Sequence, residues 1–192
     1  MTTRLSFSKQ TLDSAEPDAK ALLQAAHAKM GMIPNMYGFM ANFPPLLDAY
    51  LHGYHLFREK SGFTPVEQEV VFLSISYEND CEYCMAAHSF VADKQSNVPS
   101  DVISSLREGT EIKDPRLRSL SALAKAIVQK RGLPHPSDVE PFLDAGYTDN
   151  QVLALVLAVG VKTLSNYANH LLDTPPDGVF AGREWTHPSK GS

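Results

Sequence analysis

Apolar residues recur along the chain at the three- and four-residue spacing of a helix surface, and no segment shows the strict alternation that is typical of a half-buried strand. Prolines near helix starts and glycines just beyond helix ends divide this pattern into separate segments. The expected helices cover residues 18–30, 44–60, 64–77, 81–94, 115–131, 136–145 and 149–172, and residues 32–36 are expected to form a turn. The pattern therefore predicts an all-α protein.

Two of the expected helices begin with the same signal, a threonine followed three positions later by glutamate or glutamine. This spacing is that of a capping box, in which each residue satisfies the other's backbone N–H group. The two pairs are Thr64 with Glu67 and Thr148 with Gln151. The match indicates a duplicated helical hairpin, with a first copy over residues 64–94 and a degenerate second copy over 146–172. Coincidence is the alternative, because the matching stretch is short.

In the register of this repeat, the polar residues of the first copy meet different residues in the second. Glu69 corresponds to Leu153, which is expected to point into the core, so Glu69 is predicted to be a buried acid with a raised pKa. The other correspondences are Cys81 with Ser165, Cys84 with Ala168 and His88 with Leu172.

The segment 149–172 is the most hydrophobic of the chain, and it is expected to be buried on nearly all sides. Residues 1–175 are predicted to form a single domain, and residues 176–192 an extended C-terminal arm. Phe180 and Trp185 of this arm must be buried, either on the same chain or on a neighbouring subunit. So much apolar surface in a short chain predicts a homo-oligomer.

Charge and hydropathy argue against several classes of protein. The chain of 192 residues has a formal net charge of −5, which provides no basic field for nucleic acid or an anionic membrane. No apolar run approaches the roughly 20 residues of a membrane span, and the first residues lack the apolar centre of a signal peptide. A cytoplasmic location is expected.

The chain has only two cysteines, and they form the motif Cys81-Glu-Tyr-Cys84. A disulfide-stapled scaffold would use more cysteines, so the pair indicates redox or metal chemistry, with two buried apolar cysteines as the simpler alternative. If Cys81 opens a helix, Cys84 and His88 share a face of that helix. The helix N-terminus favours Cys81 as the thiol of lower pKa, and His88 can accept a proton. Glu69 can serve as a second proton acceptor, although an exposed Glu69 and a merely packed His88 are alternatives.

The pattern Glu69, Cys81-x-x-Cys84 and His88 resembles the alkylhydroperoxidase AhpD family of the carboxymuconolactone decarboxylase-like superfamily. Flanking segments at 31–35, 43–47 and 166–170 resemble its peroxidase-related branch, so that the resemblance covers roughly residues 30–175. It implies an all-α, homo-oligomeric peroxide reductase that needs no cofactor and is regenerated by a dithiol or lipoyl-type reductant. Cys84 would be peroxidatic, Cys81 resolving, and Glu69 and His88 a proton relay. Tyr83 departs from the pattern, because relatives of AhpD often have histidine there.

Three other functions remain open at this point. Glu69, Cys81, Cys84 and His88 could supply four ligands to zinc, although structural zinc sites usually draw ligands from two distant segments. Decarboxylation of a muconolactone is the superfamily's other activity and leaves the cysteine pair without a role. A helical oligomer with a non-catalytic, redox-sensing dithiol is the third.

Overall fold

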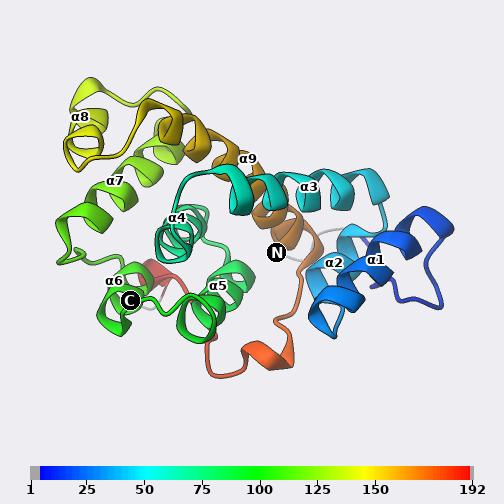
Figure 1. The fold of residues 1–192 in the computed structure, drawn as a ribbon. Helices are drawn as coiled ribbons and strands as arrows, with labels where there is room; N and C mark the ends of the chain where they lie inside the picture. Colours follow the sequence, from blue (N-terminus) through cyan, green and yellow to red (C-terminus); the bar gives the residue numbers. More distant parts are fainter. Residues whose placement is uncertain (1–4, 191–192) are drawn as a thin grey trace.

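A computed structural model describes residues 5–190 of the chain, and within this range it is all-helical, as predicted (Figure 1). The α-helices are α1 (Pro17–Met30), α2 (Asn35–Met40), α3 (Pro44–Lys60), α4 (Pro65–Glu78), α5 (Glu82–Lys94), α6 (Ser100–Glu108), α7 (Pro115–Gln129), α8 (Pro136–Asp144) and α9 (Asp149–Leu172). Two short 3-10 helices, η1 (Gly178–Phe180) and η2 (Pro188–Lys190), lie in the C-terminal arm.

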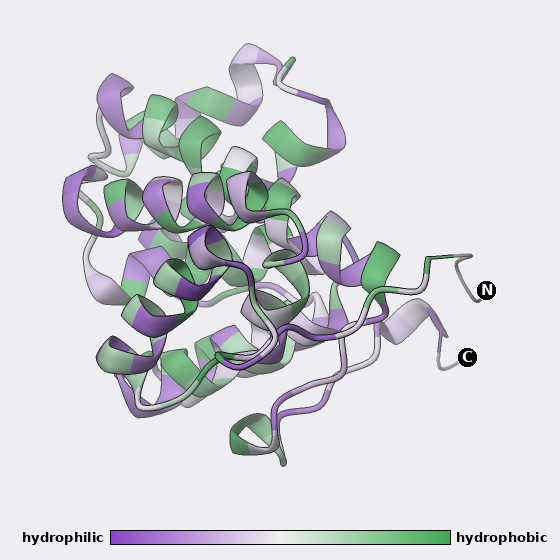
Figure 2. Ribbon diagram, turned by 90° about the vertical axis from the view of Figure 1, so that its right-hand side faces the viewer, coloured by the Kyte–Doolittle hydropathy of each residue, from purple (hydrophilic) through white to green (hydrophobic). Residues whose placement is uncertain are grey.

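Helix α4 lies at the centre of the fold, and α5, α6, α7 and α9 pack around it (Figure 1). All its residues from Glu67 to Ser76 are buried, so it has no solvent-facing stripe there. Most other helices are amphipathic, with hydrophobic and hydrophilic residues in the same helix (Figure 2). The larger hydrophobic core surrounds α4 and α7, whereas a second core joins α1, α2 and α3 to the cysteine segment.

Two short helices differ from the sequence-based expectation. Helix α2 occupies part of the expected turn, because Met36, Tyr37 and Met40 are buried against α3 and α9. Helix α6 was not predicted, although Val102 and Leu106 have helical spacing and Gly109 ends the helix with a φ of 71°. In both cases burial in the tertiary structure stabilises a helix that is too short to be stable alone.

The structure confirms the match between the two copies at their first residues but not over the rest of the repeat. Capping boxes form at Thr64 and at Thr148, as predicted. However, α9 is one continuous helix of 24 residues, so the prediction of a second hairpin is wrong. In the first copy the chain breaks at Asp80, which has a φ of +53°. The corresponding residue in α9 is Leu164, and a left-handed conformation is much less favourable for leucine than for aspartate.

Helix α9 is not buried on nearly all sides, which corrects the prediction made from its hydropathy. Leu153 is 69% exposed rather than in the core, and Val156, Tyr167 and Leu171 are each 54% exposed. The opposite face of α9 is buried, and its second half is polar there, with Lys162, Ser165, Asn166 and Asn169. Among the described helices, α9 is the one that is long and apolar enough to cross a membrane by length and composition. A core helix of a soluble protein meets the same criterion.

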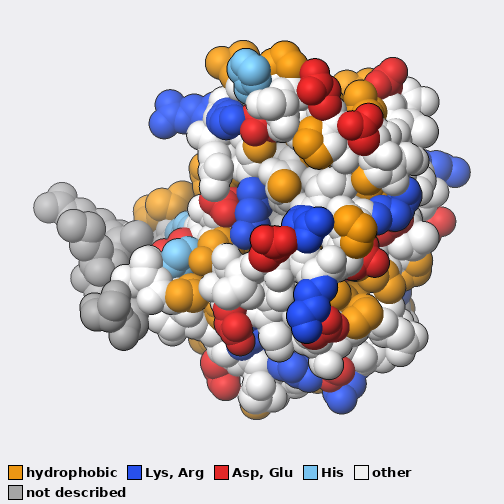
Figure 3. All heavy atoms as spheres, turned by 90° about the vertical axis from the view of Figure 1, so that its left-hand side faces the viewer, with side chains coloured by type: hydrophobic (Ala, Val, Ile, Leu, Met, Phe, Trp, Pro, Cys, Tyr) orange, Lys and Arg blue, Asp and Glu red, His pale blue; other side chains and the backbone are white. Residues whose placement is uncertain are grey.

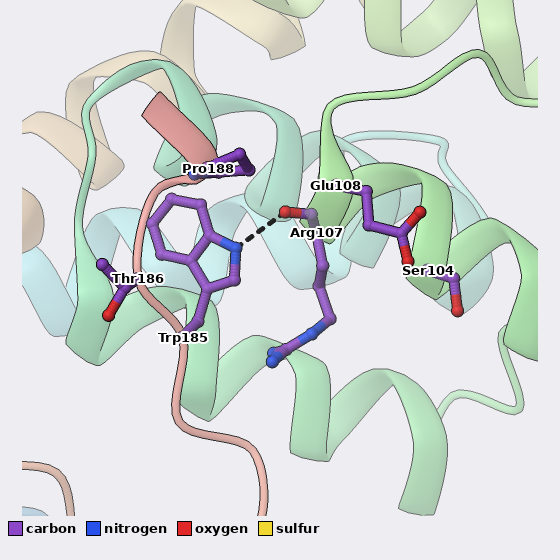
Figure 4. A pocket seen from close by; sticks show the side chains of 6 residues that line it. All are labelled: Ser104, Arg107, Glu108, Trp185, Thr186 and Pro188. Carbon is purple, nitrogen blue, oxygen red and sulfur yellow. Dashed lines mark hydrogen bonds between the residues drawn. The ribbon is translucent and has the colours of Figure 1, made fainter. Parts of the chain in front are cut away.

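The C-terminal arm packs on its own chain. Trp185 is buried, and its Nε1 donates a hydrogen bond of 2.7 Å to the backbone oxygen of Arg107 (Figure 4). The guanidinium group of Arg107 donates in turn to the backbone oxygens of Arg183 and Glu184. A hollow of about 390 Å³ lies beside this contact. On the face over α6, α7 and α8, acidic and basic side chains are interspersed, and neither sign dominates (Figure 3).

Candidate dithiol site

The two cysteines lie at the start of α5, where the chain turns sharply after α4. Cys81 is the N-cap residue and Cys84 lies within the first turn. Their exposed fractions are only 1% and 2%, and both are free thiols. The turn itself is held against α9, because Asn79 Nδ2 donates a hydrogen bond of 2.9 Å to Asn166 Oδ1. The dithiol is therefore a buried group enclosed between α5 and α9.

Glu69 and His88, which the sequence pattern singled out, are hydrogen-bonded to each other. His88 Nδ1 lies 2.8 Å from Glu69 Oε2, and the Glu69 side chain is fully buried. The second carboxylate oxygen, Oε1, lies 2.5 Å from Nη2 of Arg58, a residue of α3 that sequence reasoning missed. The ring of Phe72 packs against His88 with centroids 4.8 Å apart, so the histidine is both packed and hydrogen-bonded.

The electrostatics of this group correct one prediction. Burial alone raises the pKa of Glu69, but the charges and hydrogen bonds of His88 and Arg58 outweigh it, so the pKa of Glu69 is lowered rather than raised. Burial lowers the pKa of His88, and the charge of Lys162 lowers it further. Glu69 is therefore ionised and paired with Arg58 at neutral pH, whereas His88 is neutral.

The two thiols differ strongly in pKa. Burial acts to raise the pKa of Cys84, but hydrogen bonding from Cys81 and the charges of Lys162 and His88 place this pKa well below its ordinary value. The pKa of Cys81 is raised, because its thiol shares a proton with Cys84, because it is buried, and because a Cys84 thiolate repels a second negative charge. These contacts favour Cys84 as the more acidic thiol, whereas the helix start alone favours Cys81. The neighbouring sulfur and the α9 side chains outweigh the helix N-terminus.

The polar face of α9 forms the wall opposite Cys84. Asn169 Nδ2 donates to Cys84 Sγ at 3.4 Å, and Ser165 Oγ lies 3.9 Å from the same sulfur. Lys162 lies on this face and is fully buried. Asn169 falls within the segment 166–170 that resembles the peroxidase-related branch. Sequence reasoning missed Lys162, although a lysine that directly follows the apolar run 152–161 was a visible signal.

Tyr83, between the two cysteines, binds the C-terminal arm. Its hydroxyl donates a hydrogen bond of 2.5 Å to Asp177 Oδ2, and the Asp177 carboxylate also accepts from the backbone N–H of Asn35. Phe180 of the arm packs edge-on against the Tyr83 ring, with centroids 6.0 Å apart. The arm thus covers the cysteine segment, and Phe180 is placed on its own chain.

Three tyrosines from α2 and α3 form the remaining side of the site. Tyr37, Tyr50 and Tyr54 pack in a row, with centroid distances of 5.9 and 5.8 Å, and Tyr54 accepts a hydrogen bond from Arg58. Negative charge on Cys84 contributes to the raised pKa of each of these tyrosines, which places their hydroxyls within its field.

The arrangement does not favour the zinc alternative. Among residues 5–190, no three histidine, cysteine, aspartate or glutamate side chains converge as a metal site would require. Glu69 is already bound to Arg58 and His88, and the positive charges of Arg58 and Lys162 would repel a metal cation.

Three solved structures are similar in fold to this chain. The alkylhydroperoxidase AhpD core of a peroxidase-related protein from Ralstonia eutropha JMP134 matches 94% of this chain and 95% of its own, with a TM-score of 0.77 and 22% identity. A peroxidase-related protein from Silicibacter sp. TM1040 matches 95% of each chain, with a TM-score of 0.76 and 19% identity. The debrominase Bmp8, crystallised with 2,3,4-tribromopyrrole, matches 94% of this chain and 97% of its own, with a TM-score of 0.76 and 12% identity.

No protein-family model and no curated protein matches the sequence. The chain has the AhpD-like fold, as the four-residue motif predicted. At these identities the likeness establishes the fold, whereas the reaction has to be argued from the dithiol site itself.

Proposed function

We propose that this protein is a thiol-dependent hydroperoxide reductase. The observation that carries the proposal is a buried pair of free thiols at the start of α5, with Asn169 Nδ2 3.4 Å from Cys84 Sγ. Several contacts favour the thiolate of Cys84, whereas Cys81, three residues earlier, keeps its proton and lies close enough to share it. A low-pKa thiol beside a protonated one supplies a nucleophile and a resolving group.

In the first step, the Cys84 thiolate attacks one peroxide oxygen. The S–O bond forms, the O–O bond breaks, and the sulfur is oxidised by two electrons as the peroxide is reduced to an alcohol or water. In the second step, the Cys81 sulfur attacks the Cys84 sulfenic acid, and water leaves as the disulfide forms. A dithiol or lipoyl-type reductant returns both cysteines to thiols and is itself oxidised to a disulfide.

His88 is the proton carrier in this scheme. Its Nδ1 is fixed by Glu69, so its other ring nitrogen is the one left for exchange, and a neutral histidine can accept the proton of Cys81 during disulfide formation. Glu69 holds the orientation of His88, and Arg58 keeps Glu69 ionised. Glu69 is thus an orienting group in this proposal rather than a free proton acceptor.

A second candidate reaction is reductive removal of halogen from an aromatic ring. Bmp8 has the same fold, and the row of Tyr37, Tyr50 and Tyr54 near Cys84 would suit a flat aromatic ligand. In this reaction the two thiols supply two electrons and the C–Br bond is replaced by a C–H bond. Bromide is released, and the two cysteines form a disulfide. The lyase and redox-sensor functions have no comparable feature in their favour.

Turnover distinguishes these functions. Purified protein is supplied with a dithiol reductant and either an alkyl hydroperoxide or a brominated pyrrole, and consumption of each is followed. We expect repeated consumption of peroxide and a mass loss of two hydrogens in the oxidised protein. A single stoichiometric oxidation without turnover would indicate a sensor, and free thiols that persist under excess peroxide would refute both redox functions. A homo-oligomer in the cytoplasm is part of the proposal.

A further inference from the structure

Lys162 is a buried cation that the reaction described above does not use. Its side chain projects from the middle of α9 with no solvent exposure. Its Nζ makes no hydrogen bond of ordinary length, and among residues 5–190 no carboxylate forms an ion pair with it. The ammonium group lies 5.5 Å from the centre of the Phe72 ring, the same ring that packs against His88. An unpaired buried charge costs several kcal/mol, so an anionic partner is expected.

The charges around Cys84 leave one candidate for the anionic partner of Lys162. Arg58 is neutralised by Glu69, and His88 adds a positive charge beside Cys84 only when it is protonated, which its lowered pKa disfavours at neutral pH. Tyrosines on α2 and α3, and Tyr83 on α5, face the site with protonated hydroxyls. Cys81 keeps its proton. The remaining positive charge is Lys162, and the remaining acidic group in its field is Cys84.

We propose that Lys162 is a positioning residue of the dithiol site, whose buried ammonium group is the counter-ion that holds Cys84 as a thiolate. Burial lowers the pKa of His88, and the same charge lowers it further, which favours the neutral form that can accept a proton. Lys162 thus acts on both reacting partners from the opposite wall. Asn169 and Ser165, on the same face of α9, add polar contacts to the sulfur. The inference rests on the proposed function only in taking Cys84 as the reactive thiol.

The test measures ionisation of Cys84 directly, by the ultraviolet absorbance of a thiolate near 240 nm as a function of pH. The parent protein carries Cys81→Ser, so that Cys84 is the only thiol and a hydroxyl still lies beside it. In this parent, Lys162→Met should raise the midpoint of the titration by about one to three pH units, the usual effect of losing an adjacent opposite charge. Lys162→Arg should keep the midpoint closer to that of the parent.

Lys125→Met is the matched control. Lys125 also lies over an aromatic ring, with Nζ 4.4 Å from the centroid of Tyr77, but it pairs with Glu78 and is not among the charges that shift the pKa of either thiol. Its replacement should leave the midpoint unchanged. An unchanged midpoint in Lys162→Met, or an equal shift in both variants, would overturn the inference.

A second measurement covers the case in which Lys162→Met folds poorly. In a Cys84→Ser background, where Lys162 has lost its counter-ion, Lys162→Met should raise the thermal midpoint, whereas it should not do so beside Cys84. Equal effects in both backgrounds would also refute the pairing. Neither measurement requires peroxide, so failure of the peroxidase assay and failure of this inference are separate results.

Discussion

Helices α4 and α9 begin with the same capping box, yet one is followed by a break and the other continues for 24 residues. The break after α4 places Cys81 and Cys84 at the start of α5. The continuous α9 presents Lys162, Ser165 and Asn169 to them from the opposite side. The comparison shows that the second copy of the repeat does more than fill the hydrophobic core. In the proposed function, the first copy supplies the groups that react, and the second supplies the side chains that set their charge.

The strongest test of this division is to remove each thiol in turn. Cys84→Ser should abolish reaction with peroxide, because the remaining Cys81 thiol has a raised pKa and stays protonated at neutral pH. Cys81→Ser should still react once, and mass spectrometry should then find an added oxygen on Cys84 and no disulfide. The reverse pattern would assign the nucleophile to Cys81 and undo the comparison.

His88→Gln should slow the peroxide reaction by a factor of roughly 10² to 10⁴, which is typical for loss of general acid–base catalysis. Glutamine has a similar volume and can still bind Glu69, so the thermal midpoint should change little. Stopped-flow kinetics at neutral pH provide the measurement. An unchanged rate would return His88 to a packing role.

Glu69→Gln and Glu67→Gln compare a buried ion pair with a helix cap on the same helix. Because Glu69 is ionised and paired with Arg58, Glu69→Gln should destabilise the protein, by about 3–5 kcal/mol for a broken buried pair. This reverses the expectation that follows from a raised pKa. Glu67→Gln should cost about 0.5–2 kcal/mol. Urea denaturation measures both, and a larger loss for Glu67→Gln would contradict the comparison.

The pH dependence of stability follows from the same groups. The pKa of Glu69 is lowered in the folded state, so its contribution is present above the unfolded pKa and is lost as pH falls towards the folded pKa. The pKa of His88 is also lowered, so the unfolded chain binds the extra proton first, and stability falls as pH drops below about 6.5. His88→Gln should remove the part of this loss that begins just below the unfolded pKa of about 6.5, as followed by thermal denaturation.

The smallest expected effect concerns the outer face of α9, which is apolar where the corresponding stretch of α4 is buried. Leu153 and Val156 are more than half exposed, and a partner subunit would cover them in a homo-oligomer. Leu153→Glu should weaken that association while leaving the fold intact, and light scattering should show a smaller mass than for the parent. A monomeric parent at micromolar concentration would refute the oligomer.

Local signals in the sequence predicted most helices, both capping boxes and the four-residue motif. Those signals act within one helical turn, so they can be recognised without tertiary structure. They could not reveal Arg58 or Lys162, which reach the site from α3 and α9 and are brought there only by packing. For the same reason the pKa of Glu69 was predicted in the wrong direction, and the expectation for Cys81 left out the α9 side chains. Both were argued from burial or from a helix end, whereas partners distant in sequence decide the outcome.

The hydrogen bond from Tyr83 to Asp177 has a kinetic consequence. Both cysteines are at most 2% exposed, and Tyr83 between them is bound to Asp177 of the arm. A lipoyl group or a second protein therefore cannot reach the sulfurs until a local opening exposes them, and such openings occur on timescales from microseconds to seconds. The rate of opening therefore sets an upper limit on the turnover rate. Above a certain concentration of reductant, the turnover rate of the protein should no longer rise. The value of this plateau should depend on how firmly Asp177 holds the arm rather than on how reactive the thiols are.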